Sequence, residues 1–218
     1  MSGELEAILK SGADEVGVQL NRHMISMFEL YLIELKAWNQ KINLTSLKDD
    51  KSIITDHFID SLSVVPYLPA TGRLLDAGSG AGFPGVPIKI ARPEIDITLL
   101  ESKRKKINFL KQVILLLNLS HTTVLHGRIE SFVPGENIPL FDIIIARAFT
   151  RLEPLLKLAR PLLQNGGYVV AMKGKEGHHE LKKNGPVLKS LSMEVVKVVD
   201  LQLPESHKKR SVFFIAKT

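Results

Sequence analysis

Three glycines at alternate positions follow a short apolar run, and their types and spacing are suited to ligand binding. The run is Leu74-Leu75-Asp76-Ala77, followed by Gly78, Gly80 and Gly82, with Pro84 shortly after. Glycine is needed where a backbone turns with positive φ or approaches a ligand closely, and proline is tolerated in the first turn of a helix. The pattern therefore predicts a strand, a tight binding loop and a helix whose free N–H groups face the ligand.

Two classes of cofactor are compatible with this loop. The segment Gly80–Gly85 matches the G-x-G-x-x-G fingerprint of dinucleotide-binding proteins, whereas Asp76 with its alternate glycines matches the loop of proteins that bind S-adenosylmethionine (SAM). Glu101 ends the next apolar run, and an acid there can accept hydrogen bonds from both ribose hydroxyls of a nucleoside. Because NAD and SAM both contain such a ribose, Glu101 predicts nucleoside binding without choosing between them.

Clusters of basic residues suggest a polyanionic partner. The chain of 218 residues has a formal net charge of +6, and residues 172–218 hold ten Lys and Arg against five Asp and Glu. A basic balance is equally compatible with a solvated surface. Lys103-Arg104-Lys105-Lys106 places cations in the expected first turn of a helix, where the helix dipole disfavours them. Such a local conflict can mark function, and these cations could then face phosphates. The alternative is that they are simply exposed to solvent.

The elements that position these residues alternate along the chain after Gly72. Strands are expected at 73–77, 95–100, 122–126 and 141–146, and helices near 84–91, 103–118 and 151–163. Strands separated by helix-length segments form a parallel sheet through right-handed crossovers, and ligands bind at the carboxyl ends of its strands. Since Asp76, Glu101, the turn 127–130 and Arg147 all follow strand ends, we expect them to meet at one edge of the sheet.

The last part of the chain predicts an antiparallel end to this sheet. We expect a fifth strand at 167–172, a helix at 178–190, and two strands at 193–201 and 211–217. The short basic link between the last two strands favours antiparallel pairing. A mostly parallel sheet that ends in an antiparallel hairpin is typical of SAM methyltransferases rather than of dinucleotide-binding proteins.

Residues 1–70 are expected to form a helical extension, and residues 71–218 the α/β domain. Helices are predicted over 4–20, 22–42 and around 56–61. The second of them has an apolar stripe at three- and four-residue steps, which predicts packing against the main domain. His57, between two acids, could bind a ligand or could be a histidine whose hydrogen bonds are satisfied within the fold.

Composition limits the class of protein. Hydrophobic residues make up 44% of the chain and charged residues 24%, as in globular domains. No apolar run approaches the roughly 20 residues of a membrane span, and Met1–Lys10 is unlike a secretory signal, so we expect a cytoplasmic protein without a membrane partner. The chain has no cysteine, which excludes disulfides and thiolate ligands. Its seven histidines show no metal-ligand spacing, and we expect no metal and a monomer.

Several longer motifs occur together over nearly the whole chain. They are Trp38-Asn39, Asn43-Leu44-Thr45, His57–Leu62, Asp76–Gly85, Glu101-Ser102, Gly127–Glu130 and Ala146-Arg147-Ala148-Phe149. The Gly-Phe-Pro-Gly end of the glycine loop and the Ala-Arg-Ala-Phe segment are much more specific than the glycines alone. Together the motifs resemble those of the bacterial small-subunit ribosomal RNA guanine-N7 methyltransferases, a family also called glucose-inhibited division protein B.

The resemblance implies a class I SAM-methyltransferase fold, SAM as cofactor, and a guanine near the decoding centre of 16S ribosomal RNA as substrate. The partner is then the free 16S ribosomal RNA or the small ribosomal subunit. The predicted cofactor contacts, from the loop and the resemblance together, are Asp76, Gly78, Gly80, Gly82, Phe83, Glu101, Ser102, Ile129, Glu130 and Arg147. The family usually has a small residue where Ile129 stands, so the contact there could be through the backbone.

The residues present narrow the choice of methylated atom. Methylation of pyrimidine C5 typically uses a Cys nucleophile, and methylation of an exocyclic amine commonly uses an Asn/Asp-Pro-Pro-aromatic segment; this chain has neither. Guanine N7 has an in-plane lone pair and no proton. Its methylation needs no general base and can depend on the alignment of the reacting atoms. We therefore assign no catalytic residue.

Base access and charge suggest how RNA would bind. N7 lies in the major groove, which is deep and narrow in RNA, so we expect an unstacked or flipped target base. The basic residues expected to contact the substrate are Lys173, Lys208, Lys209 and Arg210. Arg147 could position the cofactor or the guanine O6 edge, or form a structural salt bridge. Two alternatives stay open at this point, an NAD-dependent oxidoreductase and a non-catalytic RNA-binding module with a vestigial SAM pocket.

Overall fold

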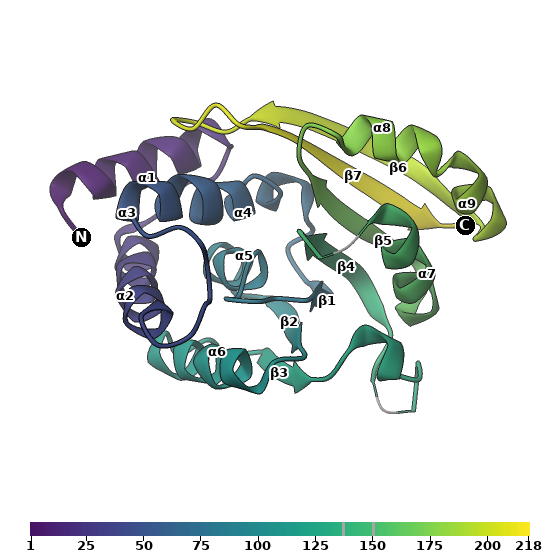
Figure 1. Cartoon of the computed structure of the whole chain (residues 1–218), viewed down its shortest axis with the longest axis horizontal. Coiled ribbons are helices and arrows are strands. Elements are labelled where there is room, and N and C mark those ends of the chain that lie inside the picture. Colours follow the sequence, from purple (N-terminus) through teal and green to yellow (C-terminus); the bar gives the residue numbers. More distant parts are fainter. Residues whose placement is uncertain (137, 150) are drawn as a thin grey trace.

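The chain folds around one seven-stranded sheet in a computed structural model, which describes residues 1–136, 138–149 and 151–218. The strands are β1 (Gly72–Ala77), β2 (Ile95–Glu101), β3 (Thr122–His126), β4 (Phe141–Arg147), β5 (Leu163–Lys173), β6 (Met193–Gln202) and β7 (Lys209–Lys217). Their order is β3-β2-β1-β4-β5-β7-β6 (Figure 1). β1 to β5 pair in parallel, whereas β7 is antiparallel to β5 and β6. The predicted mostly parallel sheet with an antiparallel terminal hairpin is confirmed.

Helices cover both faces of the sheet. The α-helices are α1 (Gly3–Glu15), α2 (Arg22–Asn39), α3 (Asp50–Ile53), α4 (Asp60–Leu62), α5 (Gly85–Ala91), α6 (Arg104–Leu116), α7 (Leu152–Ala159), α8 (Gly177–Lys183) and α9 (Gly185–Ser190). Ile54–Ile59 is a π-helix, and Val65–Tyr67, Ile129–Ser131 and Arg160–Leu162 are 3-10 turns. Helices α1, α2, α5 and α6 contribute to one hydrophobic cluster, and α7 and α9 to a second.

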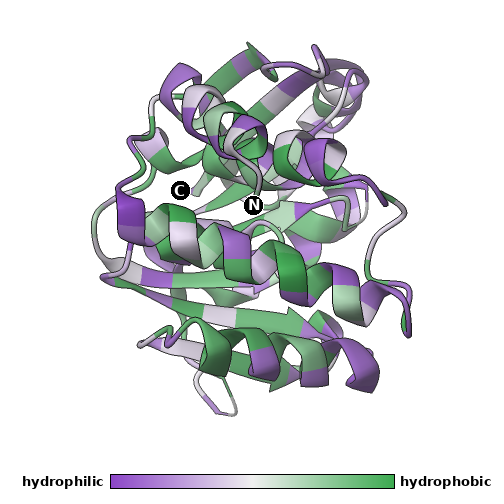
Figure 2. Cartoon of the chain, turned by 90° about the vertical axis from the view of Figure 1, so that its left-hand side faces the viewer, coloured by the Kyte–Doolittle hydropathy of each residue, from purple (hydrophilic) through white to green (hydrophobic). Residues whose placement is uncertain are grey.

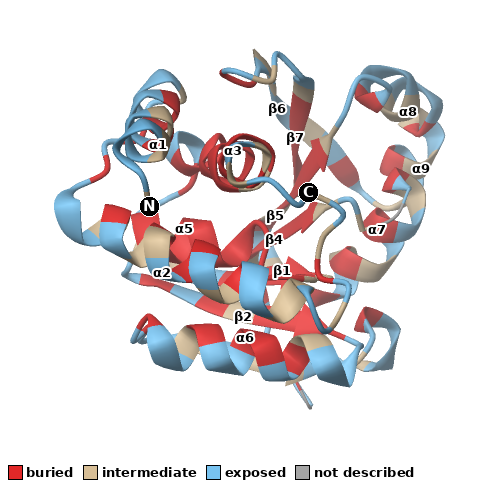
Figure 3. Cartoon of the chain, turned by 60° about the vertical axis from the view of Figure 1, so that its left-hand side comes forward, coloured by how far each residue is buried: buried red, intermediate tan, exposed pale blue. Residues whose placement is uncertain are grey.

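Alternate residues of the central strands face these two clusters. Leu74 and Ile143 belong to the first cluster, and their neighbours Leu75 and Ile144 to the second. The last four residues of β1 are all buried, as expected for a strand covered on both faces. Figure 3 shows the buried central strands and the exposed outer sides of the helices. This double covering holds the carboxyl ends of β1, β2 and β4 in fixed positions.

The N-terminal helices pack directly onto one face of the sheet. Phe28 and Tyr31 of α2 are fully buried in the cluster that also contains Val86 of α5 and Phe109 of α6. Figure 2 shows hydrophilic and hydrophobic residues mixed along these helices, as their amphipathic patterns predict. The boundary at residue 70 stays a prediction. No helix in the described ranges is long and apolar enough to cross a membrane.

Several helices are shorter than predicted, for local reasons. The helix expected over 4–20 ends at Glu15, and Gly17 follows with φ of +81°. The helix expected over 151–163 ends at Ala159 because Pro161 lacks the next N–H donor, and β5 then begins at Leu163. The helix expected over 178–190 is divided after Lys183, because Pro186 lies in the first turn of α9.

The helix predicted around 56–61 is longer and less regular than expected. α3, the π-helix and α4 follow one another without a break from Asp50 to Leu62. π-helical turns are rare and occur frequently at functional sites. This one carries Asp56 and His57, and Asp60 follows it directly. The segment thus presents two carboxylates and an imidazole within five residues.

Candidate active site

The glycine loop is held against the end of β2 by its own backbone. The N–H groups of Gly78 and Ser79 both donate to the carbonyl of Leu100, at 3.0 and 2.9 Å. Gly78 has φ of +75°, and a Cβ there would collide with the ring of Phe149. A side chain at this position would therefore be strained and would displace the aromatic ring beside the loop.

The second half of the loop faces the core. A Cβ on Gly82 would lie 2.7 Å from Cγ2 of Val86 and 2.8 Å from Oη of Tyr31. Phe83 is only 6% exposed, and its ring stacks on His57 with centroids 4.5 Å apart. The structure thus places Gly82 and Phe83 in the packing layer behind the loop. Their assignment as cofactor contacts stays a prediction.

Two carboxylates flank the loop. Asp76 is fully buried; its Oδ2 accepts the N–H of Gly85 at 3.0 Å, and its Oδ1 accepts no hydrogen bond from the residues that the structure describes. Burial raises the pKa of Asp76 to about 7, although the Gly85 hydrogen bond opposes the rise. Glu101 accepts the N–H of Gly80 at 3.0 Å and those of Ser102 and Lys103 at 2.8 Å.

Glu101 also explains the cations at the start of α6. Lys103, Arg104 and Lys105 are exposed at the helix N-terminus, as predicted. The helix has no side-chain cap from its own N-cap residue, and the Glu101 carboxylate supplies the missing acceptor and negative charge. Nζ of Lys106 lies close to Gly80, 3.8 Å from where a Cβ would stand. One of the four cations therefore borders the glycine loop.

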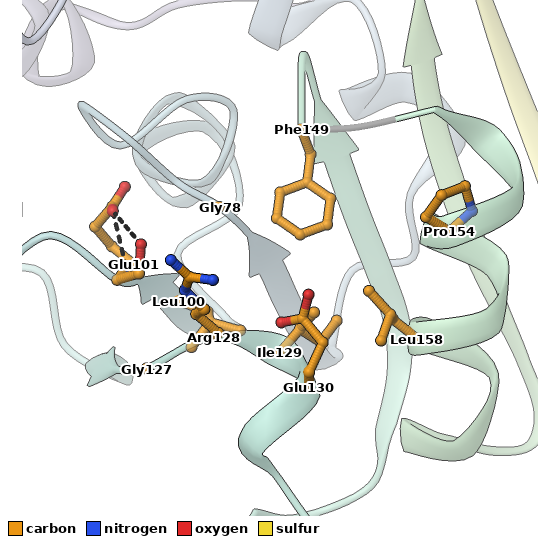
Figure 4. A pocket seen from close by; sticks show the side chains of 11 residues that line it. Gly78, Leu100, Glu101, Gly127, Arg128, Ile129, Glu130, Phe149, Pro154 and Leu158 are labelled. Carbon is orange, nitrogen blue, oxygen red and sulfur yellow. Dashed lines mark hydrogen bonds between the residues drawn. The ribbon is translucent and has the colours of Figure 1, made fainter.

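A cavity of about 310 Å³ opens beside the loop, and we call it the loop cavity (Figure 4). The predicted residues Gly78, Glu101, Ser102, Ile129 and Glu130 line it. The lining residues that the sequence analysis did not assign are Leu100, Gly127, Arg128, Phe149, Pro154 and Leu158. Figure 4 shows Phe149, Glu130 and Leu158 pointing toward a common space. The carboxyl ends of β1, β2 and β4 therefore meet here, as their order predicts.

The residues missed by the sequence analysis carry two signals. Phe149 follows β4 by two positions, and strand ends are where ligands bind in such sheets. Pro154 and Leu158 are four positions apart on α7 and so lie on the same face of that helix. Neither signal alone could predict that Phe149, Pro154 and Leu158 line the same cavity, because that depends on how α7 packs relative to the end of β4.

A second cavity of about 340 Å³ lies on the other side of the end of β4, and we call it the ion-pair cavity. Its lining includes Arg147, Lys173, Lys208 and Arg210, four of the five predicted substrate contacts, together with Ser46, Leu47, Asp56, His57, Asp60, Ala148, Met172 and Gly174. The fifth, Lys209, is exposed and is not part of the described lining.

The cations of this cavity are bound to carboxylates of the protein. Asp60 is 2% exposed and accepts Nε of Arg210 and NH1 of Arg147, each at 3.0 Å. Oδ2 of Asp56 lies 2.6 Å from Nζ of Lys208. Lys173 pairs with Glu180 of α8 at 3.0 Å. Three of these pairs therefore hold β4 and the terminal hairpin against the N-terminal helices, and the fourth holds α8 against β5.

Arg147 is fixed from several directions. Its NH1 donates to the carbonyl of Asp56 at 2.9 Å, its NH2 lies 3.0 Å from Nδ1 of His57, and its guanidinium lies over the ring of Phe83. Burial, followed by the charge of Arg147, lowers the pKa of His57 to about 3. His57 is therefore neutral at physiological pH. Its Nδ1 lies 3.1 Å from the carbonyl of Asp56, and its Nε2 lies 2.6 Å from Oγ1 of Thr45.

The two cavities meet at consecutive residues of one short segment. Arg147 and Ala148 line the ion-pair cavity, and Phe149 lines the loop cavity. Ala148 has φ of +51°, a conformation that side chains rarely adopt and that is common at functional sites. A ligand in one cavity would thus lie next to a ligand in the other. No cluster of His, Asp and Glu that could hold a metal occurs in the described part of the chain.

Comparisons with known proteins agree with this geometry. Residues 24–212 match the GidB family, described as rRNA small subunit methyltransferase G. The Ribosomal RNA small subunit methyltransferase G of Geobacter sp. (strain M21) is 40% identical over 210 residues, which cover 96% of each chain. A methyltransferase from Pyrococcus furiosus aligns with a TM-score of 0.61 and 15% identity, over 87% of this chain and 97% of that one. M. jannaschii TYW2 in complex with AdoMet aligns with a TM-score of 0.58 and 9% identity, over 73% and 75%. The structural likenesses confirm the predicted class I SAM-methyltransferase fold.

Proposed function

This chain belongs to the rRNA small subunit methyltransferase G family, and from this premise we propose that it transfers a methyl group from SAM to N7 of a guanine in 16S ribosomal RNA. The family is the one that the sequence motifs resemble, and membership makes the chain a SAM-dependent rRNA methyltransferase. Neither the comparisons nor the fold supports the NAD-dependent oxidoreductase alternative. The observation that carries the proposal is the loop cavity, which is lined by Gly78 after β1 and by the Glu101 carboxylate at the end of β2.

The residues of the loop cavity fit SAM. Oε1 of Glu101 accepts the N–H groups of Ser102 and Lys103 and the Ser102 hydroxyl. Among the described residues Oε2 accepts one N–H group, that of Gly80, so it keeps an acceptor site for a ribose hydroxyl. Asp76 lies next to the glycine loop but outside the described lining of the cavity. We propose that its buried oxygen, which no described residue satisfies, binds a cationic group such as the ammonium of SAM. When bound, SAM supplies a methyl group on a positively charged sulfur. We propose Phe149, Ile129 and Leu158 as the apolar walls around the adenine.

The protein contributes alignment rather than proton transfer. N7 of guanine has a lone pair and no proton, so the reaction needs a held base and a held donor. The rigid carboxyl ends of β1 and β2 carry the proposed donor site, and Arg147 and Ala148 connect it to the ion-pair cavity. Arg147 is bound by Asp60, His57 and the carbonyl of Asp56. We propose that Arg147 positions the reacting groups from this fixed orientation.

The substrate contacts are proposed for the same reason. Arg147, Lys173, Lys208, Lys209 and Arg210 lie in or beside one cavity, and several of them already bind carboxylates. A carboxylate and a phosphate attract the same cations, so RNA phosphates can exchange with Asp56 and Glu180. Because the substrate is ribosomal RNA, we place the enzyme in the cytoplasm. We propose that it acts as a monomer, since one chain contains both cavities.

Methyl transfer from labelled SAM tests the proposal. We expect purified protein to transfer a tritiated methyl group to 16S ribosomal RNA in small subunits from cells that lack the modification. Parallel reactions with free 16S ribosomal RNA decide between the two forms of the substrate. Absence of label from both would overturn the proposal. In the same preparation, S-adenosylhomocysteine should raise the melting temperature and NADH should not.

A further inference from the structure

Asp56 has a buried carboxylate oxygen that accepts no hydrogen bond from the described residues. It lies on the π-helix, is 8% exposed and lines the ion-pair cavity. Its Oδ2 binds Nζ of Lys208 at 2.6 Å, while its buried Oδ1 accepts no hydrogen bond within the described ranges. A buried polar atom left unpaired costs free energy and usually has a functional explanation.

The other carboxylate in the described lining of this cavity differs from Asp56. Both oxygens of Asp60 are occupied, one by Arg210 and one by Arg147, and both cations are well covered. The carboxylate of Asp56 has one partner among the described residues, the ammonium of Lys208, whose side chain is 52% exposed. An ion pair with so exposed a partner contributes little to stability. Asp60 is thus suited to hold the fold, and Asp56 to exchange its partner for a ligand.

The chemistry of a carboxylate selects among the bases. Guanine presents two N–H donors side by side on its Watson–Crick edge, from N1 and from the N2 amine, and these match two carboxylate oxygens in the way that a guanidinium does. Adenine and cytosine place a lone pair beside their amine, and uracil has one N–H between two carbonyls. Unstacked RNA bases are commonly read on this edge. A carboxylate facing the base therefore favours guanine.

We propose that Asp56 is the residue that selects guanine, by accepting hydrogen bonds from N1–H and the N2 amine of the target base after Lys208 moves away. The inference rests on the proposed function. N7 lies on the opposite side of the purine from the N1–H and N2 amine. A guanine held by Asp56 through these two groups can therefore present N7 to the methyl group of SAM. Release of Lys208 frees both carboxylate oxygens, and its ammonium becomes available to an RNA phosphate.

Inosine at the target position tests this assignment. Inosine lacks the N2 amine but keeps N7, O6 and N1–H, so a site that does not read the Watson–Crick edge would methylate it as well as guanosine. In reconstituted small subunits, we expect the wild-type kcat/KM to be about tenfold or more lower with inosine than with guanosine, because an unpaired carboxylate oxygen would be left. In Asp56→Asn, the guanosine rate should fall, and the ratio of the two rates should approach one.

Two further variants separate reading of the base from stability. Lys208→Met keeps the carboxylate and should keep the preference for guanosine. Glu205→Gln breaks the neighbouring surface pair with Lys51 and should change neither rate. Equal wild-type rates for guanosine and inosine would overturn the role of Asp56 while leaving the methyltransferase intact, even if Asp56→Asn failed to fold. Absence of transfer to guanosine by the wild type would overturn the proposed function, and this inference with it.

Discussion

The loop cavity and the ion-pair cavity lie on opposite sides of the same strand end but are built differently. Around the loop cavity, main-chain groups set the shape. The N–H groups of Gly78 and Ser79 donate to the carbonyl of Leu100. The Glu101 carboxylate accepts the N–H groups of Gly80, Ser102 and Lys103. In the ion-pair cavity, charged side chains from distant segments hold one another, with Asp60 between Arg147 and Arg210. The first cavity is formed by the sheet itself, and the second by ion pairs, among which the pair of Asp56 and Lys208 is the one that we propose a ligand replaces.

This difference matches the two partners of a methyltransferase. A small cofactor has one shape and benefits from a site that is already in place. A large polyanion brings its own charges, and a site that keeps its cations paired until RNA arrives avoids leaving them unpaired and buried. The comparison predicts that changes in the ion-pair cavity affect folding first, whereas changes in the loop cavity affect cofactor affinity first.

Replacement of Arg147 by alanine should have the largest effect. The buried carboxylate of Asp60 would lose one of its two cations, and His57 would lose its contact with the guanidinium. Breaking a buried ion pair by removing one partner costs about 3 kcal/mol or more. We expect that loss in the free energy of unfolding, measured by urea denaturation without ligand.

The matched control is Arg128→Ala, which removes an exposed cation from the lining of the loop cavity. A surface substitution of this kind should change the free energy of unfolding by no more than about 0.5 kcal/mol. If both variants lost the same stability, the proposed distinction between the two cavities would be wrong.

A smaller effect is expected from the charge on Asp76. The pKa of Asp76 is raised to about 7 in the folded protein, whereas the unfolded chain releases this proton near pH 4. The free energy of unfolding should therefore fall as the pH rises from about 4 to about 7. The ammonium of S-adenosylhomocysteine should favour the ionised form. We expect its affinity to rise about tenfold between pH 6 and pH 8, measured by titration calorimetry.

Asp76→Asn supplies the comparison for that measurement. An amide at this position cannot ionise but keeps an acceptor for the N–H of Gly85. The variant should bind S-adenosylhomocysteine weakly at both pH values and should lose the stability slope between about pH 4 and 7. A wild-type affinity that does not change with pH would contradict the assignment of Asp76 to the cationic end of the cofactor.

The smallest effect is expected from exposed cations. Lys209 and Arg104 are exposed and form no ion pair with any described residue, unlike Lys208 and Arg210. Replacement of either by glutamine should reduce the slope of log affinity against log salt by about 0.7 if it contacts a phosphate of single-stranded RNA. S-adenosylhomocysteine affinity should stay the same. An unchanged salt slope in filter-binding assays would remove that residue from the RNA surface.

The same contrast explains what could be predicted from the sequence. Asp76, Gly78 and Glu101 stand at strand ends, and strand order alone brings such positions together in a parallel sheet. The motif does not specify side-chain direction, so it could not show that Gly82 and Phe83 pack toward the core, and their assignment as cofactor contacts stays a prediction. Local sequence patterns could therefore predict part of the lining of the loop cavity, because those residues lie in short segments at strand ends.

The ion-pair cavity could not be predicted in this way. Arg147 binds Asp60 across 87 positions, and Lys208 binds Asp56 across 152. Periodicity and spacing carry no signal at that separation, so the basic residues were recognised as a group while their carboxylate partners were not. Phe149 belongs to the Ala-Arg-Ala-Phe motif, but its place against Gly78 depends on the backbone conformation at Ala148, which the motif does not specify.

Identification of the methylated nucleoside tests the central claim most directly. Small subunits from cells that lack the modification would be incubated with the protein and SAM, and their 16S ribosomal RNA digested to nucleosides for mass spectrometry. The account predicts 7-methylguanosine at a single site, and none when SAM is omitted. A methyl group on an exocyclic amine, on a ribose or on another base would contradict it.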